Sequence, residues 1–186
     1  MISIVIATYG DKNHWDKVAE TAIRSVWQQT STNWEMFRTH EATLAEARNY
    51  GARAASNDRL VFLDADDELD PRFVESITEA EDILQPLTVY RNLEATSEPY
   101  WIEPRTDLLD GNHIVVGAPV KRQVFLDSGG FDDYPIAEDW ALWLKLRKRG
   151  ATFGRTSAKY IVNVNPQGRN TLPENGWLDR IRKAYG

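Results

Sequence analysis

Residues 59–71 read RLVFLDADDELDP, an apolar run that ends in a cluster of carboxylates and a proline. Residues 60–63 are apolar without polar alternation, which is typical of a strand buried on both faces. Pro71 suits the first turn of a helix, and Asp70 would then be the N-cap of that helix. The carboxylates are therefore expected on the loop at the carboxyl end of a central strand, where open α/β sheets bind ligands.

This acidic loop has the composition of a divalent-metal site. Carboxylates a few ångströms apart oppose each other's ionisation, and a hard cation removes that cost. Mg²⁺ and Mn²⁺ prefer oxygen ligands, and Mg²⁺ usually takes one or two carboxylates together with the phosphates of a substrate. Asp64 and Asp66 form an Asp-x-Asp pair of this kind. A solvated acidic turn that caps a helix is the simpler interpretation. The choice between this turn and a metal site depends on the rest of the sequence.

The composition sets limits on the class of protein. The chain has 186 residues, of which 42% are hydrophobic and 27% charged, as expected for one globular domain. A formal charge of −6 argues against a nucleic-acid partner, and the absence of cysteine excludes disulfides and thiolate metal sites. Residues 1–7 are too short an apolar run for a signal peptide, and no run approaches the roughly 20 residues of a membrane helix. We therefore expect a cytoplasmic domain without a transmembrane segment.

Strands and helices alternate in the first third of the chain. Strands are predicted at residues 2–7, 34–37 and 60–63, and helices at residues 15–29 and 41–55. This alternation predicts an α/β fold with a mostly parallel central sheet flanked by helices.

The rest of the chain continues with both kinds of element. The pattern predicts helices at residues 73–84, 121–127, 137–149 and 177–185, and strands at residues 87–93, 100–102, 114–116 and 160–164. Residues 165–175 are polar and contain glycine and proline, so they are a candidate lid.

A second acidic pair, Glu138 and Asp139, falls in the first turn of the predicted helix at residues 137–149. The helix dipole favours carboxylates there, which is a sufficient structural reason for them. However, a glycine-rich break and a loop precede the pair, at residues 129–137. A carboxylate at such a junction could face a cleft and take a proton from an attacking hydroxyl, as general bases do.

Four segments of the chain resemble, in order, the motifs of family 2 glycosyltransferases of the GT-A fold. SIVIATY at residues 3–9 looks like the opening strand, and ARNYGA at residues 47–52 looks like the helix before the metal motif. FLDADD at residues 62–67 looks like the Asp-x-Asp motif. GGFD at residues 129–132, followed by EDW at residues 138–140, resembles the acceptor-side motif. The resemblance implies a single, Rossmann-like GT-A domain.

The resemblance also implies an activity and its cofactor. It implies an inverting transferase that moves a sugar from a nucleotide-sugar donor, with a UDP-sugar expected, to a hydroxyl of a glycan or another acceptor. By similarity, Asp66 would bind an Mn²⁺ or Mg²⁺ ion at the donor diphosphate, and Asp64 would lie near the ribose and the metal. Residues 1–70 would form the nucleotide-binding half, and residues 87–186 the acceptor half with a C-terminal lid and helix.

The same resemblance assigns roles to five further residues. Thr8 and Tyr9 would line the nucleotide pocket, and Arg48 could approach the diphosphate. Asp139 would be the general base for the acceptor hydroxyl, with Glu138 beside it. This division is chemically coherent, because a metal neutralises the leaving diphosphate while a carboxylate activates the nucleophile.

The chain also departs from the family pattern at two places. Relatives often carry an Asp-Asp-x-Ser stretch after the second strand, whereas here WEMF at residues 34–37 runs directly into RTHE. Many relatives also have a histidine near the C-terminal strand, where this chain has Asn163 and Asn165. The first departure concerns binding of the nucleobase, and the second concerns a third metal ligand.

Three alternatives remain open from the sequence. A sugar- or nucleotide-binding module of the same fold without activity would explain the missing Asp-Asp-x-Ser stretch. A haloacid-dehalogenase-like phosphatase also places Asp-x-Asp after an apolar strand, although on its first strand. An EF-hand-like calcium loop would use acids at positions 1, 3, 5, 7 and 12, but its glycine position is Leu69 here. The acids at those positions are Asp64, Asp66, Glu68, Asp70 and Glu75.

Overall fold

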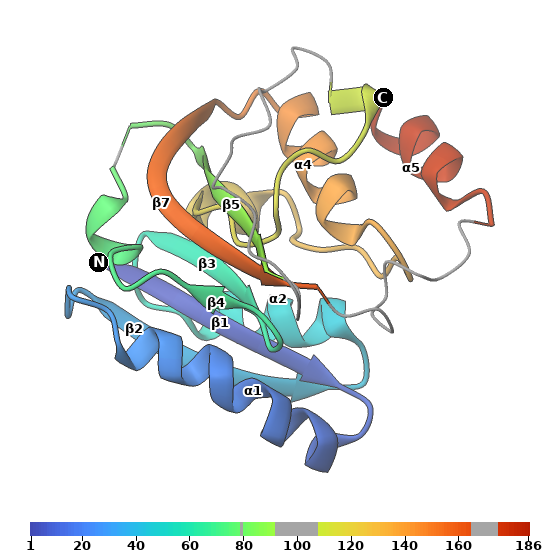
Figure 1. Cartoon of the computed structure of the whole chain (residues 1–186). Coiled ribbons are helices and arrows are strands. Elements are labelled where there is room, and N and C mark those ends of the chain that lie inside the picture. The colour runs from blue at the N-terminus through green and yellow to red at the C-terminus, as the bar shows by residue number, and fades with distance from the viewer. Residues whose placement is uncertain (79, 92–107, 165–174) are drawn as a thin grey trace.

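Three parallel strands form one side of the sheet, with β1 (Ile2–Tyr9) between β2 (Trp34–Glu41) and β3 (Arg59–Asp64) (Figure 1). The computed structural model describes residues 1–78, 80–91, 108–164 and 175–186. In the register of these strands Ala7 lies opposite Asp64. The carboxyl ends of the three strands therefore meet at one edge of the sheet.

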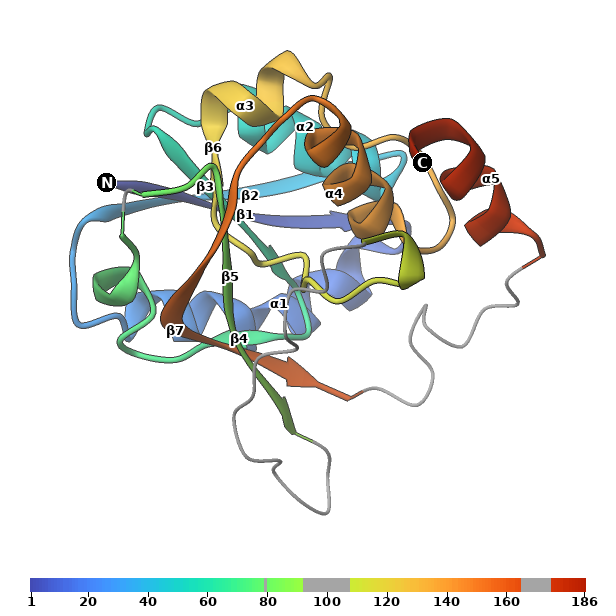
Figure 2. The ribbon, with the colours of Figure 1, turned by 90° about the horizontal axis from the view of Figure 1, so that it is seen from above.

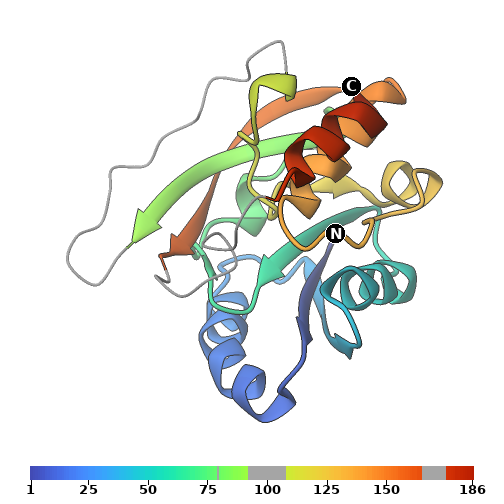
Figure 3. The same cartoon turned by 90° about the vertical axis from the view of Figure 1, so that its right-hand side faces the viewer.

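Four shorter or more curved strands extend this sheet. Strand β6 (Val120–Lys121) pairs antiparallel with β3, and β5 (Ile83–Arg91) follows it. Strand β7 (Phe153–Asn163) runs parallel to β5, as Figure 3 shows, and β4 (Glu68–Leu69) pairs with its end. Among the described residues the strand order is β2-β1-β3-β6-β5-β7-β4. The sheet is mixed and mostly parallel, which confirms the predicted fold class.

Helices cover both faces of the sheet. Helix α1 (Lys12–Trp27) lies on one face, whereas α2 (Leu44–Ala54), α3 (Arg122–Asp127) and α4 (Glu138–Lys148) lie on the other (Figure 2). Helix α5 (Trp177–Tyr185) packs beside α4. These helices confirm the predictions for the corresponding segments. None of the helices in the described segments combines the length and the apolar character that crossing a membrane requires.

Burial on both faces explains why the central strands lack polar alternation. Ile4 and Ile6 of β1 pack in the cluster that contains α1, whereas Val5 packs in the cluster that contains α2. Gly51 permits this second contact, because a Cβ there would lie 2.4 Å from Cγ1 of Val5. The apolar runs of the sequence are therefore needed by two separate cores, one on each side of the sheet.

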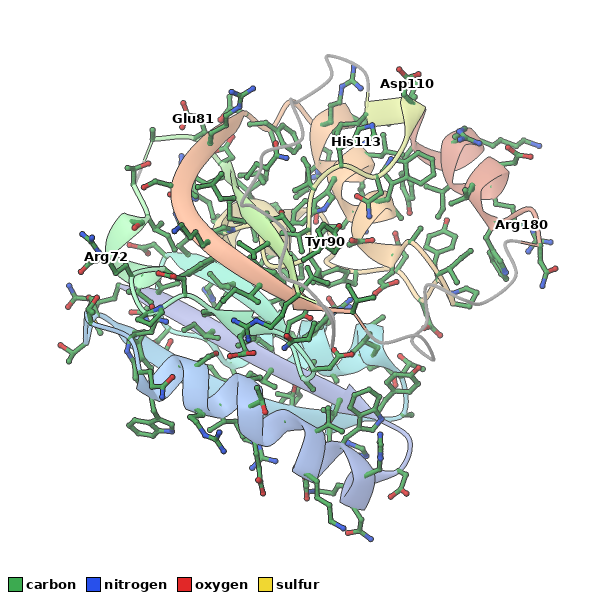
Figure 4. The ribbon with its side chains drawn as sticks, in the orientation of Figure 1. Arg72, Glu81, Tyr90, Asp110, His113 and Arg180 are labelled. Carbon is green, nitrogen blue, oxygen red and sulfur yellow. The ribbon has the colours of Figure 1, made fainter. Side chains whose placement is uncertain are left out.

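The C-terminal helix closes the second of these cores. Ile181 is fully buried in the cluster that also contains α4. Arg180, labelled in Figure 4, is exposed, and its guanidinium lies 4.6 Å from the centre of the Trp177 ring. The helix is thus amphipathic as predicted, with its apolar side facing the domain.

The predicted helix at residues 73–84 is wrong. Asp70 caps only a tight turn, in which its Oδ1 accepts from the N–H of Arg72, and a single 3-10 turn at Val74–Ser76 follows. Ile83 and the residues after it instead form β5, and the pairing of this strand is irregular between Gln85 and Leu87. The irregularity accommodates Pro86, which has no N–H to donate to a neighbouring strand. Pairing with β7 therefore outweighs the helical spacing of the apolar residues.

The predicted strand at residues 114–116 is also wrong. Ile114 and Val116 are buried, but the carbonyl of Ile114 accepts from the indole N–H of Trp143. The chain then turns, with the N–H of Ala118 donating to the carbonyl of Val115. The predicted strand at residues 100–102, and residues 165–174 of the candidate lid, lie outside the described residues.

Candidate active site

Three carboxylates gather in a tight turn at the carboxyl end of β3. Ligand oxygens of Asp64, Asp66 and Asp67 lie within 4.8 Å of one another, and the N–H of Asp67 donates to the carbonyl of Asp64. Burial and the charge of Asp64 raise the pKa of Asp66, and burial and both neighbours raise the pKa of Asp67 further. Such crowding is what a divalent cation relieves, so the residues fit an Mn²⁺ or Mg²⁺ ion.

A buried arginine connects this turn to the second acidic pair. Arg48 lies on α2, and its side chain is only 2% exposed. One guanidinium nitrogen lies 2.6 Å from Oδ1 of Asp64, and the other lies 2.7 Å from Oε1 of Glu138. The face of the Phe131 ring is 4.9 Å away. The two acidic sites of the sequence are therefore held by one side chain.

Local sequence explains why Arg48 is placed there. Thr43 and Glu46 form a capping box, in which the hydroxyl of Thr43 accepts from the N–H of Glu46 and the carboxylate of Glu46 accepts from the N–H of Thr43. This cap starts α2 shortly after β2 ends, so the first turns of the helix lie beside the carboxyl edge of the sheet. The predicted contact of Arg48 with a diphosphate remains a prediction.

Helix α4 begins with the acidic pair and is firmly anchored. Trp140 donates its indole N–H to the carbonyl of Leu108 at 2.7 Å, and Trp143 makes the equivalent bond to the carbonyl of Ile114. Ala137, just before the helix, has a φ of 56°, which is uncommon for a residue other than glycine. This entry turns Glu138 toward Arg48.

Asp139 has different partners from its neighbour Glu138. Its carboxylate accepts from the side-chain amide of Asn112 at 2.8 Å and from the N–H of Trp140 at 2.8 Å. Burial and the charge of Glu138 raise the pKa of Asp139 to about 6, against the opposing effects of Asn112 and Arg48. A carboxylate that ionises near neutral pH is well suited to general-base chemistry.

The predicted nucleotide-pocket residues lie at the end of β1. The hydroxyl of Thr8 is 3.0 Å from Nδ1 of His40, which lies opposite it in the neighbouring strand β2. Tyr9 lines a pocket together with Thr43 and Glu138. The structure thus brings Tyr9 and Glu138 to one pocket, while Thr8 is not among the residues that line it.

Several contacts at this site were not predicted from the sequence. The hydroxyl of Tyr160 donates to Asp67, and Asn112 orients Asp139. Nothing in the local sequence distinguishes either residue, because each contact depends on a segment distant in the chain.

Asn163 donates its side-chain amide to the carbonyl of Asp66 and to Glu68, and Asn165 lies outside the described residues.

The surroundings of the acidic turn do not match two of the alternatives. A strand precedes the turn and the short strand β4 follows it, so the helix–loop–helix frame of an EF-hand is not formed. Glu75, the twelfth position of that loop, pairs with Arg72 and Thr30. The turn also follows the third strand of the chain, whereas the phosphatase motif lies on the first.

Comparisons with known proteins bear on the fold of the chain. The model of the glycosyl transferase family 2 matches residues 36–106. TarS from S. aureus superposes on 99% of this chain and 42% of its own, at a TM-score of 0.63 and 14% identity. TarS 1–349 in complex with UDP-GlcNAc gives a TM-score of 0.67 at 13% identity, covering 92% of this chain and 61% of its own. No curated protein matches the sequence.

The superpositions define the class of the fold. Their TM-scores place the chain among proteins of the GT-A fold, and the chain spans 42% to 61% of the length of the TarS chains. The family match then covers β2, α2, β3 and the acidic turn. The GT-A fold expected above from four motifs is thereby confirmed, and the family 2 match supports the resemblance over residues 36–106.

Proposed function

We propose that this domain transfers a sugar from a nucleotide-sugar donor to an acceptor hydroxyl, with inversion at the anomeric carbon and with a bound Mn²⁺ or Mg²⁺ ion. Asp64 and Asp66 would hold the metal, which when bound would neutralise charge on the leaving diphosphate. A UDP-sugar is the expected donor, because TarS 1–349 binds UDP-GlcNAc and UDP. The acceptor would be a glycan or another hydroxyl compound.

Asp139 would act on the other reactant. Its carboxylate would take the proton of the acceptor hydroxyl, whose oxygen would form a bond to the anomeric carbon. The bond between that carbon and the diphosphate oxygen would break at the same time. Attack from the face opposite the leaving group inverts the configuration of the anomeric carbon.

One observation carries this proposal more than any other. Arg48 lies 2.6 Å from Asp64 and 2.7 Å from Glu138, although the sequence places these acids in separate motifs. Asp139, the proposed base, directly follows Glu138 in the chain. A metal site and a general base have to lie close together for group transfer, whereas a binding module needs only one of them. In the same proposal, residues 1–70 bind the nucleotide and residues 87–186 bind the acceptor.

Replacing Asp66 with alanine tests the metal site. We expect Mn²⁺-dependent binding of UDP to weaken by roughly 100-fold or more. Mutation of a residue that only hydrogen-bonds to a metal ligand already lowers metal affinity by about 10- to 100-fold, and Asp66 is proposed to be a ligand itself. Calorimetric titration of UDP with and without Mn²⁺ measures this. Asp70→Ala is the matched control, since Asp70 only caps the next turn. Equal losses in the two variants would contradict the assignment of Asp66.

The pKa of Asp139 predicts the pH dependence of transfer. A carboxyl with its pKa raised to about 6 stays protonated, and therefore inactive as a base, well above the usual value of 3.8. We expect kcat/KM for the acceptor, at saturating donor and Mn²⁺, to be constant above this pKa and to fall about tenfold per pH unit below it. A rate that is unchanged down to pH 4.5 would show that Asp139 is not the base.

A further inference from the structure

The last residues of β7 hold the acidic turn in place by hydrogen bonds. The hydroxyl of Tyr160 donates to Oδ2 of Asp67 at 2.9 Å and accepts from the N–H of Asp64 at 3.1 Å. The N–H of Asn163 donates to Oδ1 of Asp67 at 2.9 Å, and its side-chain amide donates to the carbonyl of Asp66 at 2.8 Å. Strand β7 therefore makes four hydrogen bonds to a turn that spans Asp64 to Asp67.

The tyrosine in this arrangement has little freedom to move. Tyr160 is fully buried, and it pairs with Thr88 of β5 on one side and with Leu69 of β4 on the other. A Cβ on Gly117 would lie 2.0 Å from a carbon of its ring, so the absence of a side chain at Gly117 makes room for the ring. The hydroxyl is therefore held at a fixed point beneath the acidic turn.

The three acids of the turn have different surroundings. Asp67 is only 6% exposed, and both its oxygens accept hydrogen bonds from β7. The side chain of Asp64 is 35% exposed, and Asp66 is also partly exposed. Buried carboxylates need such partners, because an unpaired polar group in the interior is costly. Asp67 thus anchors the turn to β7, while Asp64 and Asp66 remain accessible.

We propose that Tyr160 and Asn163 are positioning residues of the metal site, which act through Asp67 and the turn backbone to hold Asp64 and Asp66 together for a divalent cation. Repulsion between the carboxylates drives them apart when no cation is bound, so a fixed backbone supplies the convergence that binding requires. This inference rests on the proposed function, since it assumes that the turn binds a metal.

Tyr160→Phe removes only the hydroxyl and is the direct test. Mn²⁺ is titrated into the full chain, alone and with UDP, and free Mn²⁺ is measured by electron paramagnetic resonance. We expect the affinity for Mn²⁺ to fall by about 10- to 100-fold, as for other residues that support metal ligands. Asn163→Ala, which keeps the backbone N–H, is a second variant in case Tyr160→Phe does not fold. It should weaken Mn²⁺ binding in the same direction.

Tyr185→Phe is the matched control. It also removes a tyrosine hydroxyl that bonds to a carboxylate, but here the tyrosine lies on α5 and the carboxylate, that of Asp132, lies in the loop between α3 and α4. It should bind Mn²⁺ as the wild type does. If Tyr160→Phe and Asn163→Ala both bind Mn²⁺ with wild-type affinity, the positioning role is overturned, but the metal site itself is not. A wild-type protein that binds no Mn²⁺ in either titration would overturn the metal site of the proposed function, and this inference with it.

Discussion

Replacing Asp139 with asparagine is expected to lower the rate of glycosyl transfer by about 10²- to 10⁴-fold, the usual contribution of a general base. Asparagine has nearly the same shape, but it cannot take a proton from the acceptor hydroxyl. Donor binding should be unchanged, because Asp139 bonds to Asn112 and Trp140 and not to the acidic turn. The measurement is kcat for transfer, together with the affinity for UDP in the presence of Mn²⁺.

Asp127→Asn provides the control for this variant. Asp127 is an exposed acid at the end of α3 that bonds to Gln123, and its replacement should leave both quantities unchanged. An Asp139→Asn protein with the full transfer rate would show that the base is another group. A loss of donor affinity equal to the loss of rate would indicate a binding role instead.

Replacing Arg48 with methionine is expected to lower the free energy of unfolding by about 3–5 kcal/mol, the range seen when one partner of a buried ion pair is removed. The substitution would leave Asp64 and Glu138 without the cation that both now contact. The acidic turn and the start of α4 would then repel each other. Urea unfolding at neutral pH measures the loss, and transfer activity should fall with it.

Arg38→Met is the matched control for the arginine. Arg38 pairs with Asp16 at 2.9 Å, but the two side chains are 47% and 41% exposed. Exposed pairs of this kind contribute about 0–1 kcal/mol, so this variant should unfold almost as the wild type does. An Arg48→Met protein that is no less stable than the Arg38→Met protein would contradict the structural role assigned to Arg48.

The sequence predicts the elements whose signals are local. Strands β1 and β3 follow from apolar runs, and α4 follows from a glycine-rich break before an acidic first turn. The helix expected at residues 73–84 does not form. Ile83 and Leu84 fit the spacing of a helix, but they belong to strand β5. Their actual place in the sheet depends on β7, whose paired residues lie 70 positions further along the chain. Pairing at that distance leaves no mark on the short-range pattern.

The site shows the same division between local and distant information. Asp64, Asp66, Glu138 and Asp139 stand out because carboxylates cluster beside predicted strand and helix ends. That Arg48 bonds to Glu138 could not be predicted, since 90 residues separate them. Tyr160 and Asp67 are 93 residues apart, and their contact requires β7 to end beside the acidic turn. Sequence motifs thus indicate the reactive groups, whereas the fold determines which groups support them.

Thermal unfolding with nucleotide diphosphates and nucleotide sugars, each with and without Mn²⁺, tests the central claim most directly. A ligand at 100 times its Kd stabilises a protein by roughly 2.7 kcal/mol, which for a domain of this size raises Tm by about 5–10 °C. The account predicts a rise of this size that requires both Mn²⁺ and one nucleotide, with UDP compounds expected. No rise with any nucleotide, or the same rise without Mn²⁺, would contradict a metal-dependent nucleotide-sugar transferase.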